Sequence, residues 1–265
     1  MDLGLKEARV LVTGGASNIG RGIVHGFAAE GSRIVIADID EDQAERVKTE
    51  ALARGAAAVE VVAGDLTREG EAQRAVDAAV SSWGGLDALV NNAGWSTPGF
   101  VAKNRDRDNW QRTVEINFYT AIAATQAALD PMREQGSGSL VFVASEAAFG
   151  QIRQGVYGAT KAAVVAFART TAREHGRHGI RSNIVCPGLV VPEGPEAVGA
   201  NSLWSVGKDN VFTDDQAQYL LKDTPMGSLT TAEDVANAVL WLSSARAARQ
   251  VTGQLFSVSG GYTMP

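Results

Sequence analysis

The chain has 265 residues, of which 45% are hydrophobic and 20% are charged, as is usual for a globular protein with one large core. Its net charge of −6, with no basic tract, argues against nucleic acid or an anionic membrane as a partner. No window reaches the ~18–20 apolar residues of a membrane span, and the first residues lack the order of a secretion signal. We therefore expect one cytoplasmic domain over residues 1–265, with a small-molecule partner and no metal site.

Short β-branched runs alternate with alanine-rich amphipathic stretches along the chain. Most of these runs are apolar throughout, as in strands that are covered on both faces. The predicted strands are 9–12, 33–37, 58–62, 88–90, 139–143, 181–186 and 254–258. The predicted helices are 19–30, 41–53, 69–82, 108–134, 156–176 and 231–243, the fourth bent or interrupted near Pro131. This alternation predicts an α/β fold: a doubly wound, Rossmann-like parallel sheet of seven strands with helices on both faces.

Residues 191–225 break the alternation with prolines and glycines scattered among apolar residues. A connection of this length inside a compact domain is usually a lid or a binding loop. We predict a substrate lid here, within the single domain. Its aromatic residues, Trp204 among them, are compatible with lining a substrate pocket or with packing the lid onto the body.

A glycine-rich turn follows the first predicted strand and leads into a helix, from Thr13 to Gly22. Such a turn lets a pyrophosphate approach the backbone at a helix N-terminus, where N–H groups and the helix dipole favour anions. Asp38 ends the second strand, where a carboxylate accepts hydrogen bonds from the adenosine ribose and repels a 2′-phosphate. NAD is therefore favoured over NADP, although Asp38 is also compatible with a solvated helix N-cap.

Tyr157 and Lys161 lie four residues apart in a predicted helix, so they share one face with Cβ atoms roughly 5–6 Å apart. A fixed positive charge beside a phenol favours phenolate, so we expect Lys161 to lower the pKa of Tyr157. A tyrosine that exchanges a proton near neutral pH suits the interconversion of an alcohol and a ketone beside a hydride carrier. By itself the pair is also compatible with a solvent-exposed helix surface.

The order and spacing of several motifs resemble those of the short-chain dehydrogenase/reductase family. The residues that carry this resemblance are Thr13-Gly14, Asn18-Ile19-Gly20, Asp65-Leu66, Asn91-Asn92-Ala93-Gly94, Asn117, Ser145, Tyr157 with Lys161, and Pro187-Gly188. The resemblance extends over residues 8–262. Within the family the chain is most similar to the 2-hydroxycyclohexanecarboxyl-CoA dehydrogenase type, through segments 92–95, 172–180, 185–188 and 257–261.

The resemblance implies a catalytic group and a cofactor site. The implied catalytic residues are Tyr157 as acid/base, Lys161 beside it, Ser145 holding the substrate oxygen, and Asn117 completing a proton relay through water or a helix distortion. The implied NAD-binding residues are Gly14, Ser17, Asn18, Ile19, Gly20, Asp38, Ile39, Asp65, Leu66, Asn91, Ala93, Gly94, Tyr157, Lys161, Pro187, Gly188 and Val190. Purely structural roles stay open for Asn117, for Ser145 and for the turn at 91–94.

Three positions depart from the family pattern. Asn18 stands where the family usually has glycine, and asparagine tolerates a left-handed backbone better than most residues. Pro192 stands where a threonine often binds the nicotinamide carboxamide, so backbone groups or the lid must orient that ring. Ser145 lies twelve residues before Tyr157, one fewer than the family pattern implies, so the intervening loop is expected to be shortened.

The substrate is less well defined by the sequence. The predicted substrate residues are Trp95, Ser145, Glu146, Gln151, Tyr157 and Trp204. Trp95 suggests an apolar ring or chain, whereas Glu146 or Gln151 is suited to bind a second hydroxyl. Three functions remain open: a dehydrogenase of a cyclic hydroxy compound or its coenzyme A thioester, a sugar or polyol dehydrogenase, and a non-catalytic cofactor-binding regulator. By resemblance we also expect a homotetramer, assembled through the fourth and fifth helices and the last strand.

Overall fold

The computed structural model describes residues 2–205 and 214–265, with side chains omitted for 214–217. Seven strands form one parallel sheet in the order β3-β2-β1-β4-β5-β6-β7. They are β1 (Arg9–Thr13), β2 (Arg33–Asp38), β3 (Ala58–Ala63), β4 (Ala88–Asn91), β5 (Gly138–Val143), β6 (Ile180–Pro187) and β7 (Leu255–Val258). The predicted parallel sheet is confirmed, and each predicted strand agrees within about one residue at either end.

Helices follow the strands as the alternation predicts. They are α1 (Asn18–Ala29), α2 (Glu41–Ala53), α3 (Glu71–Trp83), α4 (Arg107–Val114), α5 (Thr120–Gln135), α6 (Gly155–His175), α8 (Asp214–Asp223) and α9 (Ala232–Ser243). Short 3₁₀ turns cover Glu146–Phe149, Gly176–His178 and Pro195–Ala197. No helix in the described part of the chain combines the length and apolar character needed to cross a bilayer.

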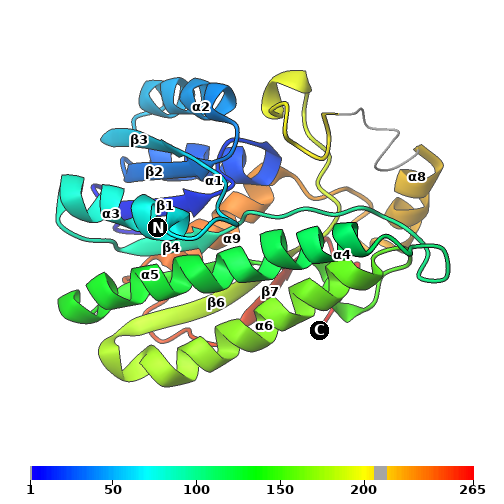
Figure 1. Cartoon of the computed structure of the whole chain (residues 1–265). Coiled ribbons are helices and arrows are strands. Elements are labelled where there is room, and N and C mark those ends of the chain that lie inside the picture. Colours follow the sequence, from blue (N-terminus) through cyan, green and yellow to red (C-terminus); the bar gives the residue numbers. More distant parts are fainter. Residues whose placement is uncertain (1, 206–213) are drawn as a thin grey trace.

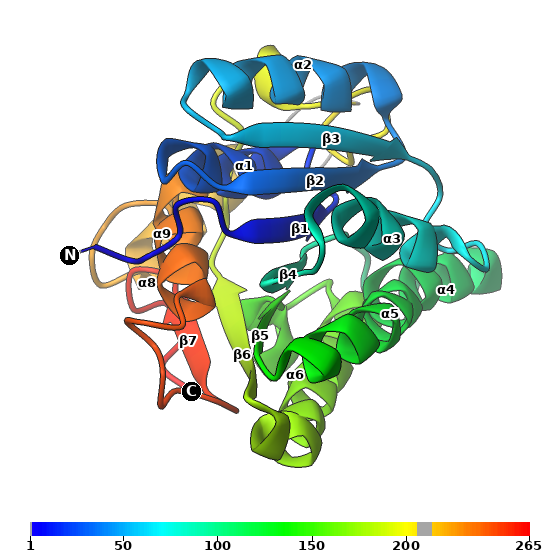
Figure 2. The same ribbon diagram turned by 90° about the vertical axis from the view of Figure 1, so that its left-hand side faces the viewer.

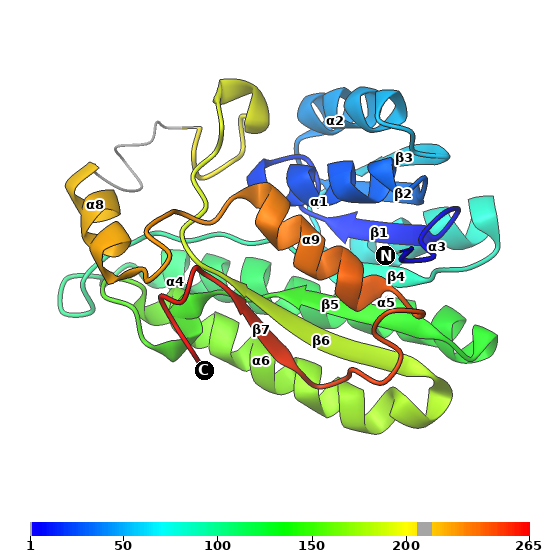
Figure 3. The same ribbon diagram turned by 180° about the vertical axis from the view of Figure 1, so that it is seen from behind.

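The sheet is covered on both faces (Figures 1 and 2). Alternate residues of β1 point to opposite sides, so Val10 and Val12 pack in one core and Leu11 in the other. The first core includes residues of α1, α2 and α9, and the second includes residues of α3, α5 and α6. Seen from behind, α9 lies across one face of the sheet beside α1 (Figure 3). Burial on both faces explains the continuous apolar runs of the strands.

The helical stretch 108–134 is interrupted at a different place from the one predicted. Residues Glu115–Tyr119 form a π-helical turn between α4 and α5, whereas Pro131 lies inside α5. The interruption is at Asn117, whose side-chain amide donates to the Thr113 carbonyl at 2.8 Å. That carbonyl would accept from the backbone N–H of residue 117 in a regular α-helix. The side chain therefore replaces a backbone hydrogen bond, which is a feature of π-bulges at functional sites.

The predicted lid, residues 191–225, is partly helical, and residues 206–213 of it lie outside the described residues. Its end forms α8, which the sequence analysis treats as part of a loop. Its beginning folds back on the strand ends: the Gly199 N–H donates to Ser17 Oγ at 2.9 Å, and Gln43 Nε2 donates to the Glu196 carbonyl at 3.0 Å. We call residues 190–205 the closing segment. This segment covers the carboxyl end of the sheet, where the glycine-rich turn lies.

Candidate active site

The strand order reverses between β1 and β4, because their connections lead to opposite sides of the sheet. Open α/β sheets bind ligands in the crevice outside the carboxyl ends of the strands at such a point. Here a cavity is lined by residues that follow β1, β2, β3, β4 and β5. This cavity, which we call the dinucleotide cleft, contains the turn after β1 and runs from Asp38 to Lys161.

The turn after β1 has the tight geometry that its glycines predict. Gly14 has φ +63°, and a Cβ there would lie 2.9 Å from Ala93 Cα. A Cβ on Gly20 would overlap the Gly14 carbonyl oxygen. Asn18 has φ +42°, so the prediction that asparagine adopts the left-handed conformation at this position is confirmed. The backbone at the start of α1 is thereby left open to a ligand.

Asp38 lies in the wall of the dinucleotide cleft. Its carboxylate accepts from the Ala16 N–H at 2.9 Å and from the Asp40 N–H at 3.0 Å. Burial raises the pKa of the Asp38 carboxyl, and these two hydrogen bonds oppose that effect. The N-cap of α2 is Asp40, which accepts from the Gln43 N–H. The alternative interpretation of Asp38 as a solvated helix cap is therefore wrong.

The structure brings most of the predicted cofactor residues to a cavity wall. The dinucleotide cleft is lined by Gly14, Ser17, Asn18, Ile19, Gly20, Asp38, Ile39, Asp65, Leu66, Ala93, Gly94, Tyr157 and Lys161, and Pro187, Gly188 and Val190 line a second cavity. The prediction that Asn91 lines the cleft is not confirmed. Asn91 is buried, and its side chain donates to Thr125 Oγ1 of α5 at 3.2 Å.

Two neighbours of these residues, which the sequence analysis does not assign, hold the cleft in shape. Asn92 Nδ2 donates to the carbonyls of Thr13 and Gly14, at 3.0 and 2.9 Å. Thr13 Oγ1 in turn accepts from the N–H groups of Asn92 and Ala93. These contacts tie the turn after β1 to the turn after β4. Thr13 and Asn92 could have been found from the sequence, because both lie at the carboxyl ends of strands that are neighbours in the predicted sheet.

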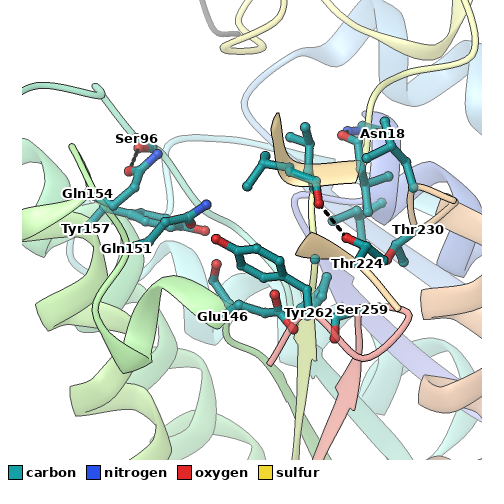
Figure 4. Close-up of a pocket in the computed structure, with 18 of the residues that line it drawn as sticks. Asn18, Ser96, Glu146, Gln151, Gln154, Tyr157, Thr224, Thr230, Ser259 and Tyr262 are labelled. Atoms are coloured by element: carbon teal, nitrogen blue, oxygen red, sulfur yellow. Dashed lines mark hydrogen bonds between the residues drawn. The ribbon is translucent and has the colours of Figure 1, made fainter. Parts of the chain in front are cut away.

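A second cavity adjoins the first (Figure 4). Asn18, Ile19, Ser96, Tyr157, Leu203 and Trp204 line both cavities. Ser145, Glu146 and Gln151 line only the second, together with residues of α8 and of the last turn of the chain, such as Leu220 and Tyr262. We call it the inner cavity. Because Tyr157 lies in the wall shared by the two cavities, ligands in both would meet at its side chain.

Tyr157 and Lys161 lie side by side on α6, with Lys161 Nζ 5.7 Å from the centre of the tyrosine ring. Lys161 is 3% exposed, and its ammonium donates to the Val143 carbonyl at 2.9 Å. Burial lowers the pKa of Lys161 to about 8. The prediction that Lys161 by itself lowers the pKa of Tyr157 is not confirmed. Burial raises the pKa of this phenol, and only the Ser145 hydroxyl acts in the other direction.

Ser145 follows β5 and begins the short helix 146–149. Its Oγ accepts from the Ala147 N–H at 3.1 Å, so it does stabilise a turn at the strand end. Ser145 and Tyr157 both lie in the wall of the inner cavity, and the Ser145 hydroxyl acts to lower the pKa of the Tyr157 phenol. Ser145 therefore combines the two roles that the sequence leaves open: it caps a turn, and it presents a hydroxyl next to Tyr157.

Asn117 is 2% exposed and lies behind the cleft. Besides the bond to Thr113, its side chain donates to the Trp95 carbonyl at 2.7 Å and accepts from the Trp95 N–H at 3.2 Å. A Cβ on Gly94 would lie 3.1 Å from Asn117 Oδ1 and 3.4 Å from Lys161 Nζ. Asn117 thus has structural partners and distorts its helix, and its oxygen and the ammonium of Lys161 face the same glycine.

Two predicted substrate residues differ in their placement. Trp204 lines both cavities, but Trp95 lines the dinucleotide cleft alone, with the Arg112 guanidinium stacked 4.4 Å from its ring centroid. The prediction that Trp95 is a wall of the substrate pocket is not confirmed, because its backbone is held by Asn117 and its ring by Arg112. Ser96, which the sequence analysis does not assign, lines the inner cavity and donates to Gln154 Oε1 at 2.7 Å.

The closing segment lies over the end of the dinucleotide cleft that contains Asp38. The Asn201 N–H donates to Asp40 Oδ2 at 3.3 Å, and Asn18 Nδ2 donates to the Val190 carbonyl at 3.1 Å. Residues 201–204 line the cleft opposite the strand ends. The segment is therefore attached at both of its ends to residues of the cofactor turn and of the start of α2.

The chain was compared with known families and structures. The family described as enoyl-(acyl carrier protein) reductase matches residues 14–263. A short-chain type dehydrogenase/reductase from Mycobacterium ulcerans has a similar solved structure, with a TM-score of 0.87, 31% identity, and coverage of 97% of this chain and 90% of the other.

Curated proteins of similar sequence cover nearly the whole chain. The BbsD subunit of an (R)-hydroxy(phenyl)methylsuccinyl-CoA dehydrogenase from Thauera aromatica is 34% identical over 262 residues, 99% of each chain. An L-rhamnose 1-dehydrogenase (NAD(P)(+)) from a Sphingomonas species is 35% identical and covers 97% of this chain and 96% of its own. One of these relatives is named for a coenzyme A thioester and the other for a sugar, so the two names describe different classes of hydroxy compound.

Proposed function

Because the chain belongs to the short-chain dehydrogenase/reductase family, we propose that it interconverts a secondary alcohol and a ketone with NAD, on a cyclic hydroxy substrate. The observation that carries this proposal is the position of Tyr157 between the two cavities, with Ser145 in the wall of the inner cavity and Lys161 beside the tyrosine ring. The dinucleotide cleft would hold the cofactor and the inner cavity the alcohol.

NAD, when bound, supplies the hydride acceptor, and the chain supplies position and proton transfer. The Tyr157 oxygen takes the proton of the alcohol as general base, and returns it in the reverse direction. Ser145 donates a hydrogen bond to the substrate oxygen and stabilises negative charge as it develops there. Lys161, held by the Val143 carbonyl, favours the phenolate once the positive charge of oxidised nicotinamide lies in the cleft.

The residues of the dinucleotide cleft fit NAD. Gly14 and Gly20 have no side chain, so the turn packs tightly and a pyrophosphate can approach the backbone at the start of α1. No basic side chain among the described residues is paired with Asp38. The basic residues of the cleft wall are Arg112, stacked on Trp95, and Lys161, beside Tyr157. A ribose hydroxyl suits the Asp38 carboxylate, whereas a 2′-phosphate would be repelled.

Asp38→Asn should therefore relax the cofactor preference. The change keeps one acceptor oxygen and the size of the side chain but removes the charge, which at about 4 Å from a phosphate costs about 1 to 4 kcal/mol. We expect kcat/KM for NADP to rise by about tenfold to several hundredfold, while kcat/KM for NAD falls by less. Asp42→Asn, the same change at an exposed position of α2, is the control and should alter neither value. An unchanged NADP rate in Asp38→Asn would contradict the assignment.

The substrate proposal has two forms. A cyclic hydroxy compound, as the free alcohol or as a coenzyme A thioester, is in keeping with the largely apolar inner cavity and with the similarity to a subunit that is named for a coenzyme A substrate. A sugar or polyol is in keeping with Glu146 and Gln151 in the same wall and with the similarity to a rhamnose dehydrogenase. A non-catalytic regulator would have no need for Tyr157 and Lys161 in one cleft, and we do not propose it.

The proposed activity is tested by following NADH absorbance with a panel of alcohols at saturating NAD. We expect turnover with cyclic secondary alcohols and none with primary alkanols of the same carbon number. Turnover only with hydroxyacyl-CoA thioesters would restrict the proposal to that class, and turnover only with free sugars would replace it by the second form. If no secondary alcohol in the panel reduces NAD, the proposed function is wrong.

We also propose that the protein is a homotetramer, as the family resemblance implies, and that it is cytoplasmic, as the sequence analysis predicts. Light scattering should give a mass near four times the 27.8 kDa of one chain. A mass near that of one chain would exclude assembly.

A further inference from the structure

Tyr262 belongs to the last turn of the chain and lines the inner cavity. Its phenol points into the cavity, and the amide of Gln151 reaches in from the opposite side (Figure 4). Both side chains are partly exposed, and neither forms a side-chain hydrogen bond with another described residue. Two polar groups that converge on a cavity without bonding to each other leave a place for a polar group of a ligand.

The chemistry of the two side chains defines that ligand group. Burial first, and then the charges of Glu146 and Asp223, raise the pKa of the Tyr262 phenol, so it keeps its proton near neutral pH. A protonated phenol donates one hydrogen bond, and the Gln151 amide can donate as well as accept. An oxygen of the ligand that lies between them can therefore accept from both.

The turn that carries Tyr262 is packed closely against the end of α8. Gly260 and Gly261 have φ +63° and +89°, a conformation that favours glycine. A Cβ on Gly260 would lie 2.8 Å from Thr224 Cγ2, and one on Gly261 would lie 3.0 Å from Pro225 Cγ. The two glycines thus allow a tight turn whose next residue, Tyr262, is directed into the inner cavity.

A buried polar cluster holds the same turn from the other side. Glu146 is 4% exposed, and its Oε1 accepts from the Ser257 hydroxyl at 3.0 Å. Ser257 Oγ lies 2.8 Å from Ser259 Oγ and donates to the Thr263 carbonyl at 2.9 Å. These contacts join the residues before and after the turn to the end of β5. Glu146 is therefore a positioning residue for Tyr262, and its carboxyl lies behind the cavity surface.

The wall of the inner cavity favours a neutral ligand. Among its described lining residues there is no lysine or arginine, and the one charged side chain is the buried Glu146. A carboxylate or phosphate of the substrate would lose water there without gaining a counterion, which is costly. Much of the remaining wall is apolar, with Ile19, Leu189 and Leu220 among its residues. An apolar ring with an uncharged oxygen suits such a wall.

We propose that Tyr262 and Gln151 determine specificity by hydrogen-bonding a second, neutral oxygen of the substrate. The substrate is then an uncharged cyclic alcohol with a further oxygen in or on its ring, a class that includes sugars. This inference rests on the proposed function, because it takes Ser145 and Tyr157 to hold the reacting oxygen. It goes further in assigning the second oxygen to the last turn of the chain and to Gln151.

The test compares cyclohexanol with tetrahydropyran-3-ol and tetrahydropyran-4-ol, in which an ether oxygen replaces one ring methylene. That oxygen accepts hydrogen bonds and donates none. We define the selectivity as kcat/KM of the better tetrahydropyranol divided by that of cyclohexanol, and we expect about 5- to 50-fold in the native protein. Tyr262→Phe keeps the ring but removes the donor, so the selectivity should fall by about 3- to 10-fold. The inductive effect of the ether oxygen is the same in both proteins and cancels in this comparison.

Gln151→Leu removes the second polar group at nearly the same size, and it should lower the selectivity by about threefold or more. Gln151 lies outside the last turn, so this variant tests the proposal without altering that turn. Tyr119→Phe, the same change at a phenol that is 57% exposed, is the matched control and should keep the native selectivity.

Two results would overturn the proposal. If Tyr262 and Gln151 only shape the cavity, then Tyr262→Phe and Gln151→Leu change the rates of all three alcohols together and leave the selectivity as it is. A native preference for 4-hydroxycyclohexanecarboxylate over both tetrahydropyranols would show that the cavity takes an anion.

Calorimetric binding of the three alcohols to the protein with NADH separates this inference from the proposed function. A selectivity in binding that Tyr262→Phe lowers, without turnover of any alcohol, supports the subsite and contradicts the dehydrogenase proposal. Turnover of all three alcohols, with a selectivity that neither variant changes in rate or in binding, supports the dehydrogenase proposal and contradicts the subsite.

Discussion

Replacing Tyr157 by phenylalanine is expected to lower kcat about 10²- to 10⁴-fold, the usual contribution of a positioned general acid or base. The ring remains to line both cavities, so the dissociation constant of NAD should change by no more than a few-fold. The same variant should lose the pH dependence of alcohol oxidation. In the native protein that reaction should accelerate toward alkaline pH, because burial raises the pKa of the phenol and oxidation requires the phenolate.

The measurement is steady-state NADH production over a range of pH, with NAD binding followed by fluorescence. Tyr119→Phe removes a phenol from an exposed position at the end of the π-helical turn, and it should leave both kcat and the pH profile as they are. If Tyr157→Phe retains a tenth or more of native turnover, another group carries the proton, and the mechanism proposed above is wrong.

The second large effect is expected from Lys161→Met, which should abolish activity and stabilise the fold. Turnover should fall by at least about 100-fold, because the phenolate loses the ammonium beside it. The stability effect has the opposite sign. The pKa of Lys161 falls from 10.5 to about 8 on folding, so below pH 8 the folded state holds a buried ammonium at a cost of about 3 kcal/mol. Loss of the hydrogen bond to the Val143 carbonyl reduces this gain in folding free energy by about 1 kcal/mol.

The sign of the pH dependence follows from proton binding. Between pH 8 and 10.5 the unfolded chain binds a proton at this lysine that the folded chain does not, so native stability rises with pH across that interval. We therefore expect the Met variant to melt about 5 °C above the native protein at pH 7, with the difference shrinking toward pH 10. Calorimetric melting at several pH values measures this. Lys6→Met, at an exposed lysine, should change neither activity nor melting temperature, and a destabilised Lys161→Met at pH 7 would contradict the argument.

The stabilisation expected in Lys161→Met follows a common pattern, in which replacing a functional residue of an active site stabilises the fold. Lys161 stays buried because packing of α6 against β5 places it there, and the fold tolerates the cost because the rest of the core supplies stability. Lys161 is a place where local stability is given up for the proposed proton transfer.

The strands, most of the helices between them and the cofactor turn could be predicted from the sequence alone. Apolar runs such as 33–37 and 139–143 are long enough to require cover on both faces, and this requirement forces a parallel sheet with helices on each side. Asn18 takes its left-handed conformation from local sterics, which the sequence carries. The four-residue spacing of Tyr157 and Lys161 likewise fixes their common face without reference to the rest of the fold.

Features that depend on contacts between distant segments could not be predicted from the sequence. The helix is interrupted at Asn117 and not at Pro131, because the side chain of Asn117 finds the backbone of Trp95, which lies 22 positions earlier. Trp95 faces the dinucleotide cleft because Arg112 stacks on it. The pKa of Tyr157 rises because packing removes water from the phenol, and the desolvation of a side chain depends on every element around it. Spacing along the chain specifies neighbours on one helix or strand, whereas burial and partners across the fold depend on how those elements pack.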